Sequence, residues 1–99
     1  MAGRLALIIE AITEFERLLT EQRVLGADHP DALATRGNLA FWRGEGGDVA
    51  GAITEFERLL TDRIRVLGAD HPATLATRNN LAFWRRLWRG YVTARSKRP

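Results

Sequence analysis

The stretch AITEFERLLT, residues 11–20, occurs a second time without any change as residues 52–61. A further stretch, VLGADHP at residues 24–30, returns as residues 66–72, and here the offset has grown from 41 to 42 residues. The match then continues for fourteen more residues, ten of them identical, and ends at Arg86. The chain therefore contains two nearly identical copies of one unit, which indicates either a recent duplication or a sequence built from a consensus.

Each copy carries the apolar pattern of helices rather than of strands. In the second copy, apolar residues recur three and four positions apart, which places their side chains on one stripe of a helix. This stripe consists of Ala52, Ile53, Phe56, Leu59, Leu60, Ile64 and Leu67. No stretch alternates with a period of two. We therefore predict an all-α chain of four antiparallel helices, over about residues 4–25, 30–43, 48–67 and 72–92.

The ends of these predicted helices carry residues that suit helix termini. Asp48 precedes the third helix, where a side-chain oxygen can accept a hydrogen bond from a free backbone amide. Gly26 and Gly68 stand where a helix ends in a left-handed backbone conformation. Asp28 and Asp70 come shortly before a proline, which the first helical turn tolerates, so we expect these aspartates to cap the second and fourth helices.

Length and composition limit the class of protein. The 99 residues correspond to one small domain, and 45% hydrophobic with 27% charged residues are values of globular chains. The absence of cysteine excludes a disulfide framework and a cysteine-based metal site. No apolar run approaches the roughly 18 residues of a membrane span, and Glu10 interrupts the first apolar run where a secretory signal would continue. We therefore expect a cytoplasmic protein without a membrane partner.

Nearly the whole chain, to about Arg86, resembles a known family. The pattern of the tetratricopeptide repeat is matched, position by position, by Leu39, Ala40, Gly47, Asp48, Val49, Ala52, Phe56 and Leu59. The long period, with Leu-Gly-x-Asp-His-Pro and Asn-Asn-Leu-Ala, resembles the variety of kinesin light chains and many bacterial repeat proteins. HEAT and armadillo repeats fit the glycine-aspartate turn less well. Four arginines depart from the pattern. An apolar side chain is usual at the positions of Arg36 and Arg78, and a tyrosine is common at those of Arg43 and Arg85.

The resemblance implies a solenoid of paired helices, called A and B. In this chain their order is B-A-B-A. We expect a repeat domain over residues 1–92, with units of about residues 4–44 and 45–86, and a basic tail over residues 93–99.

Candidate catalytic and metal-binding residues are few. His29 and His71 each stand alone beside an aspartate and a proline, whereas a metal site needs several converging ligands. Glu14 and Glu16 point to different sides of a helix, which is typical of a solvated face. The glycine-rich stretch 44–48 lacks the lysine and hydroxyl residue of a phosphate-binding loop. We therefore expect no enzyme, no cofactor and no metal.

The A helices carry candidate residues for peptide binding. In the family that the chain resembles, A helices line a concave face on which side-chain amides bond the backbone of an extended peptide. By motif position, this role falls to Asn38 and Asn80. The neighbouring candidates are Asn79, Phe41, Phe83, Arg36 and Arg78. In the alternative interpretation these asparagines brace neighbouring helices or contact solvent.

The first and last helices carry candidate residues for self-association. On the last helix, one stripe holds Leu81, Trp84, Trp88 and Tyr91, and the first helix holds Leu5, Ile8, Ile12 and Phe15. Because short repeat arrays bury little surface, we expect the last helix of one chain to pack on the first helix of another. A two-fold swapped dimer is the simplest result, and a head-to-tail contact would give rings or filaments. The alternative is a monomer in which the last helix folds back onto the first.

The charge is distributed unevenly along the chain. Residues 85–99 hold six basic residues and no acidic residue, giving +6, and the remaining residues carry −3, which together give the net charge of +3. Arginine beside tryptophan suits contact with phosphates and bases. We therefore interpret the chain as a non-enzymatic protein-interaction module or scaffold. The alternative is a small nucleic-acid-binding protein acting through the basic tail, although a solubilising tail explains the same charges.

Overall fold

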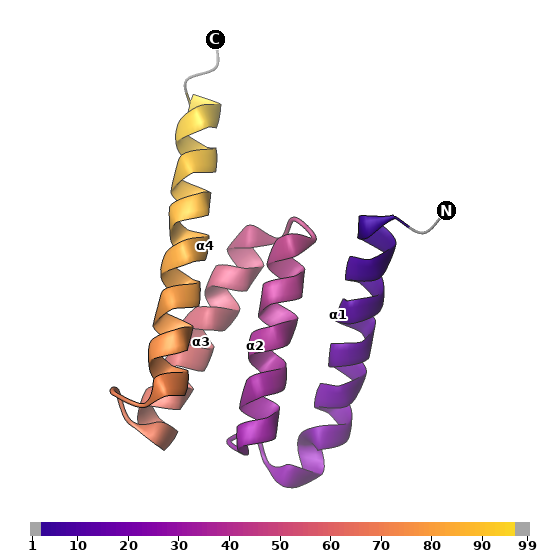
Figure 1. Ribbon diagram of the computed structural model, residues 1–99, viewed down its shortest axis with the longest axis vertical. Helices are drawn as coiled ribbons and strands as arrows, with labels where there is room; N and C mark the ends of the chain where they lie inside the picture. Colours follow the sequence, from indigo (N-terminus) through magenta and orange to yellow (C-terminus); the bar gives the residue numbers. More distant parts are fainter. Residues whose placement is uncertain (1–2, 97–99) are drawn as a thin grey trace.

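The computed structural model describes residues 3–96 and consists of helices joined by short turns (Figure 1). The elements are α1 (Arg4–Glu21), the short 3-10 helix η1 (Gln22–Leu25), α2 (Pro30–Glu45), α3 (Val49–Leu67) and α4 (Pro72–Ser96). These described residues contain no strand, so the prediction of an all-α chain is confirmed. None of their helices combines the length and the apolar character that a bilayer span requires.

Consecutive helices run antiparallel and pack mainly on their neighbours in sequence. The main contacts join α1 to α2, α2 to α3 and α3 to α4. As Figure 1 shows, α1 and α4 lie at opposite edges of the molecule, and the C-terminal part of α4 extends beyond the ends of the other helices. The arrangement therefore differs from a monomer in which the last helix folds back onto the first.

The helix termini use the predicted cap Asp48 and, before α2 and α4, the rings of two histidines. Asp48 accepts a hydrogen bond from the backbone amide of Gly51 at 2.9 Å, as expected. Before α2 and α4, the Nδ1 atoms of His29 and His71 accept the corresponding hydrogen bonds, from amides two residues ahead at 3.1 and 3.0 Å. The prediction that Asp28 caps α2 is therefore wrong. Its carboxylate instead accepts two hydrogen bonds from Arg65, at 2.8 and 2.9 Å, and these bonds hold the pKa of Asp28 below its ordinary value.

The prediction that Asp70 caps α4 is wrong for the same reason, because the ring of His71 accepts the amide hydrogen bond there. A histidine placed directly before the proline has a ring nitrogen within reach of this amide, and the neighbouring aspartate is then free for other contacts. The glycine predictions are confirmed, since Gly26 and Gly68 end their helices with φ of +93° and +95°.

The two copies differ in length by one residue, and the structure shows how the difference is absorbed. In the second copy α3 remains α-helical through Leu67, whereas in the first copy α1 ends at Glu21 and η1 completes the segment. A 3-10 helix rises by about 2.0 Å per residue and an α-helix by about 1.5 Å. Four residues of η1 therefore span about 8 Å, close to the roughly 7.5 Å of five α-helical residues. Both segments consequently reach their terminal glycines over nearly the same length.

The core lies between α2, α3 and α4. Its buried side chains are Leu33, Ala40, Ala52, Phe56, Leu59, Leu81 and Trp84. The ring of Trp84 lies against Gly44, where a Cβ atom would stand only 2.5 Å from the indole. This close approach explains why α2 carries a glycine there. On the other side of α2, the helix α1 contributes one buried side chain among the described residues, that of Ile8.

Candidate functional site

A hollow of about 300 Å³ lies between the two A-type helices, α2 and α4. It is lined by Ala34, Gly37, Asn38, Phe41, Phe56, Arg63 and Asn80. The structure therefore brings together Asn38 of α2 and Asn80 of α4, which the sequence places 42 residues apart. Both asparagines are exposed, whereas Phe56 and Arg63 of α3 are buried and half-buried.

Arg63 is a lining residue that the sequence interpretation missed. Its Nη1 atom donates to the hydroxyl of Thr77 at 2.7 Å and to the carbonyl of Ala73 at 3.4 Å, while its Nε atom is buried without a hydrogen-bond partner in the described residues. Burial, together with the nearby charge of Arg36, lowers the pKa of Arg63. Arg63 forms no ion pair with a carboxylate of residues 3–96, so the hollow contains a positive charge that is not neutralised.

The two phenylalanines predicted for peptide binding lie at different places on the surface. Phe41 is 38% exposed and packs edge-on against Trp84, with ring centroids 6.2 Å apart. Phe83 is 51% exposed and lines a separate depression on α4, which also involves Leu87 and Tyr91. Phe41 therefore belongs to the hollow between α2 and α4, and Phe83 does not.

The remaining predicted peptide-binding residues do not line the hollow. The guanidinium of Arg36 donates to the carboxylate of Asp62 on α3 at 2.7 Å. This hydrogen bond lowers the pKa of Asp62. Arg78 and Asn79 are exposed on α4. Arg36 thus connects α2 to α3, which explains why an arginine replaces the apolar residue usual at this position.

The arginines at the tyrosine positions of the repeat form the same contact in both copies. Arg43 of α2 donates to Glu16 of α1 at 3.1 Å, and Arg85 of α4 donates to Glu57 of α3 at 2.8 Å. Each pair joins an A-type helix to the B-type helix before it. Glu16, named above among the catalytic candidates, therefore joins α1 to α2, as Glu57 joins α3 to α4.

The residues predicted for self-association are placed unevenly. Ile8, Leu81 and Trp84 are buried, with 4, 3 and 2% exposure. Leu5, Trp88 and Tyr91 are exposed by 64, 39 and 56%, and Ile12 and Phe15 are half-buried. The stripe on α4 does share one side of the helix, but its first part packs into the core. Its exposed part is limited to Trp88 and Tyr91, whose rings stack with centroids 6.0 Å apart.

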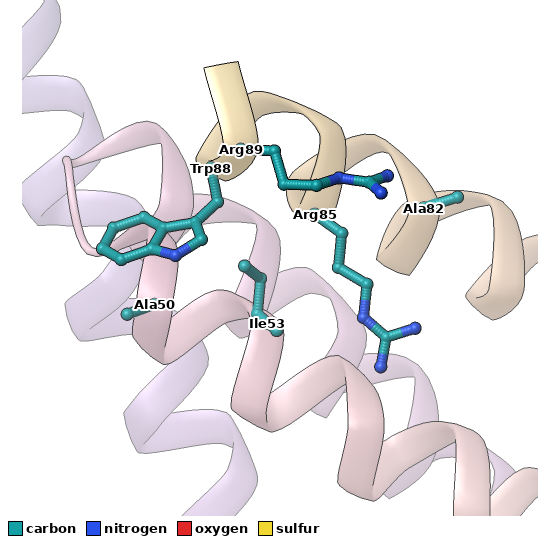
Figure 2. A pocket seen from close by; sticks show the side chains of 6 residues that line it. All are labelled: Ala50, Ile53, Ala82, Arg85, Trp88 and Arg89. Carbon is teal, nitrogen blue, oxygen red and sulfur yellow. The ribbon is translucent and has the colours of Figure 1, made fainter. Parts of the chain in front are cut away.

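Trp88 borders a depression between α3 and α4 (Figure 2). Figure 2 shows its indole reaching toward Ala50 of α3, while Arg85 and Arg89 extend to the opposite side. The depression measures about 500 Å³ and includes Ile53. The exposed end of α4 therefore combines aromatic rings with positive charge.

The basic segment at the end of the chain is described in part. Arg85 is paired with Glu57, and Arg95 lies over the ring of Tyr91 at 6.0 Å from its centroid. α4 continues to Ser96, beyond the predicted end at residue 92, since the segment has no glycine-aspartate turn. The other basic residues expected in the tail, Lys97 and Arg98, lie outside the described residues. Within residues 3–96, no cluster of three or more potential metal ligands is present.

Comparison with known proteins identifies the repeat. The family model of the tetratricopeptide repeat matches residues 32–73, which extend from the first turn of α2 through α3 to the start of α4. This family is usually non-catalytic, and its members typically mediate protein–protein interactions. No curated protein and no solved structure matches the chain.

Proposed function

We propose that this chain, whose residues 32–73 are a tetratricopeptide repeat, is a non-enzymatic interaction module that holds an extended peptide against α2 and α4. The observation that carries the proposal is the hollow in which Asn38, Asn80 and Phe41 meet beside Arg63. The two exposed amides come from consecutive A-type helices, so a peptide crossing both helices contacts both side chains.

Each lining group has a distinct part in this proposal. An asparagine amide offers two donors and an acceptor, which suits the alternating N–H and C=O groups of a peptide backbone. Phe41 provides an apolar surface for a peptide side chain. Arg63 attracts a carboxylate, because a partly buried guanidinium interacts with a charge more strongly than an exposed one does. The expected ligand is therefore a short extended peptide with an acidic residue.

Selection from a random peptide library tests the proposal. Peptides captured by the immobilised chain are labelled, and their affinities are measured by fluorescence anisotropy. We expect the double substitution Asn38→Ala with Asn80→Ala to weaken binding at least about tenfold, the equivalent of one or two backbone hydrogen bonds. Asn79→Ala is the matched control, because Asn79 is an exposed asparagine next to Asn80 that does not line the hollow. A double variant that binds like the unmodified chain contradicts the proposal.

A second proposal is self-association through apolar side chains that the fold leaves exposed. Leu5, Leu7 and Ile9 on α1 are 64, 60 and 55% exposed, and Tyr91 and Val92 near the end of α4 are 56 and 45% exposed. Such patches are typical of association sites. Light scattering during size-exclusion chromatography measures the mass. We expect an oligomer that Tyr91→Glu or Leu5→Glu dissociates, and a monomer at tens of micromolar rejects the proposal.

A further inference from the structure

The C-terminal part of α4 carries an aromatic stripe beyond the point where α3 begins. Trp84 on this side of α4 is buried in the core. Trp88, Tyr91 and Arg95 follow at steps of four, three and four residues, so they continue the same side of the helix. The indole of Trp88 reaches toward Ala50 in the first turn of α3 (Figure 2), and α4 then extends past the end of α3 (Figure 1). The stripe is therefore exposed because α4 continues beyond the helix on which it packs.

The continuation of α4 is a departure from the first copy of the repeat. There residues 45–48, Glu-Gly-Gly-Asp, end α2 and lead into α3. The corresponding residues 87–90 of the second copy are Leu-Trp-Arg-Gly and remain helical. An acidic, glycine-rich turn is thus replaced by apolar, aromatic and basic residues. Trp88 and Arg89 stand in place of glycines, so the packing of the first copy has no counterpart of these side chains.

The extended segment, residues 86–96 and called here the overhang, is also basic. From residue 71 to residue 96 the sequence contains no acidic residue. The arginines of the overhang are exposed: Arg86, Arg89 and Arg95. No ion pair within residues 3–96 includes any of them. The guanidinium of Arg95 lies over the ring of Tyr91 instead. The overhang therefore holds positive charges without compensating carboxylates, beside exposed aromatic rings.

The shape beside the stripe selects among anionic partners. Because the rings lie on the side of α4 that packs on α3, they border a corner between two helices rather than a flat face. In this corner Ile53 of α3 faces Arg85 and Arg89 of α4 across a depression of about 500 Å³. A helix with its side chains is about 10 Å thick, so α3 holds a flat bilayer or a rigid duplex away from the corner. A single strand is narrow and flexible enough to enter it.

We propose that the overhang of α4 and the corner beside it bind single-stranded nucleic acid. The stacked rings of Trp88 and Tyr91 provide a platform for bases, and the arginines of the overhang contact phosphates. Aromatic stacking combined with a positively charged surface is how proteins bind single strands without sequence preference. An acidic peptide matches the charge but makes less use of two stacked rings. This surface is separate from the hollow between α2 and α4, so the inference does not depend on peptide binding there.

A fluorescein-labelled oligothymidylate of about 15 nucleotides, long enough for a site of several bases, serves as the probe for the full chain. Its anisotropy is followed between about 50 and 200 mM salt, where we expect saturable binding that weakens as salt rises. Arg86→Gln with Arg89→Gln should reduce the slope of log affinity against log salt by about 1.4, since each phosphate contact with a single strand contributes about 0.7. The matched control is Arg17→Gln with Arg23→Gln, which removes two exposed arginines from α1 and η1 and should keep the slope.

Two further variants test the aromatic platform. Trp88→Ala and Tyr91→Ala should each weaken binding about tenfold and leave the salt slope unchanged, because stacking on a base releases no counterions. Both side chains are exposed, so the variants are expected to fold, which circular dichroism checks. Light scattering on the same samples separates an effect on nucleic-acid binding from an effect on self-association.

Several results would overturn the proposal. The first is an absence of binding at about 50 mM salt, where phosphate contacts are strongest. The second is an unchanged slope in the Arg86 and Arg89 double variant, which would assign the binding to Lys97 and Arg98. The third is unchanged affinity in both ring variants. The fourth is displacement of the probe by oligoglutamate as effectively as by unlabelled oligothymidylate, since an acidic peptide would then be the ligand.

Discussion

The helices α1 and α3 share ten consecutive identical residues but bury them differently. Leu59 in α3 is 1% exposed, whereas Leu18, its counterpart in α1, is 38% exposed. The difference arises from the neighbours, because α3 packs between α2 and α4 while α1 packs on α2 alone among the described helices. The comparison shows that one sequence can be core in one place and surface in another, so the apolar stripe by itself does not say which residues stabilise the fold.

The largest expected difference between the two copies concerns their phenylalanines. Phe56→Ala removes a side chain that is 1% exposed and leaves a cavity between three helices, so we expect a loss of about 3–5 kcal/mol in the free energy of unfolding. Phe15→Ala changes a half-buried ring and should lose less than about half as much. Urea denaturation followed by circular dichroism measures both values. Equal losses would contradict the view that burial, rather than sequence, distinguishes the copies.

The glycine of α2 and the arginine of α4 at the corresponding position provide a second comparison. Gly44→Ala places a methyl group against the ring of Trp84, and we expect overpacking to lower the free energy of unfolding by about 1–3 kcal/mol. Arg86→Ala changes an exposed side chain and should alter it by less than about 0.5 kcal/mol. Thermal and urea unfolding measure both variants. A neutral Gly44→Ala would show that the Trp84 ring has room to move.

The N-termini of α1 and α3 differ in whether a side chain caps the helix. Asp48 caps α3 through its carboxylate, whereas Gly3 precedes α1 without any side-chain hydrogen bond. We expect Asp48→Ala to lower the free energy of unfolding by about 1 kcal/mol, and Gly3→Ala to change it by a few tenths. Urea titrations of the two variants check this difference. Similar values at both positions would mean that the cap of α3 contributes little.

The smallest expected effect concerns the acidic residues at the ends of the two helices. Because Arg36 lowers the pKa of Asp62, the ionised carboxylate contributes stability that is complete above the ordinary aspartate pKa of 3.8 and is lost as the pH falls through the lower folded value. Asp62→Asn should remove this contribution, about 1 kcal/mol or less at neutral pH. Glu21→Gln is the control at the corresponding position of α1. Between pH 2 and pH 7, the free energy of unfolding of Asp62→Asn should fall less on acidification than that of the unmodified chain. Glu21→Gln should behave like the unmodified chain.

Much of the fold follows from the repeated sequence. The stripes of apolar residues predict the helices, and Gly26, Gly68 and Asp48 mark helix ends because each has a conformational or hydrogen-bonding role that few other residues fill. The histidine caps could not be predicted with the same rules, since Asp28 is an equally good acceptor in sequence. In both copies the ring nitrogen of the histidine accepts the amide hydrogen bond, while the contact of Arg65 involves Asp28 of the first copy alone, so the local geometry before the proline decides between them.

The candidate site could be predicted less completely. Motif positions identify Asn38 and Asn80, because a fixed helical register brings equivalent residues of consecutive A-type helices together. Arg63 was missed, although the extra residue near this position in the second copy signalled a local difference. The sequence predicts self-association for the stripe from Leu81 to Tyr91, yet its first half packs into the core. A stripe on a helix that contacts neighbours on two sides does not show which side remains open.

The packing of each helix mainly on its neighbours in sequence also determines how the chain gains and loses structure over time. Contacts between residues close in the chain form quickly, so helix pairs of this kind are expected to fold within microseconds to milliseconds. Opening α1 disrupts its contact with α2 and leaves the core between α2, α3 and α4 largely in place. Backbone amides of α1 should therefore exchange with deuterium faster than those of α3. α1, the indigo helix at one edge of the molecule in Figure 1, should unfold before the core between α2, α3 and α4 opens.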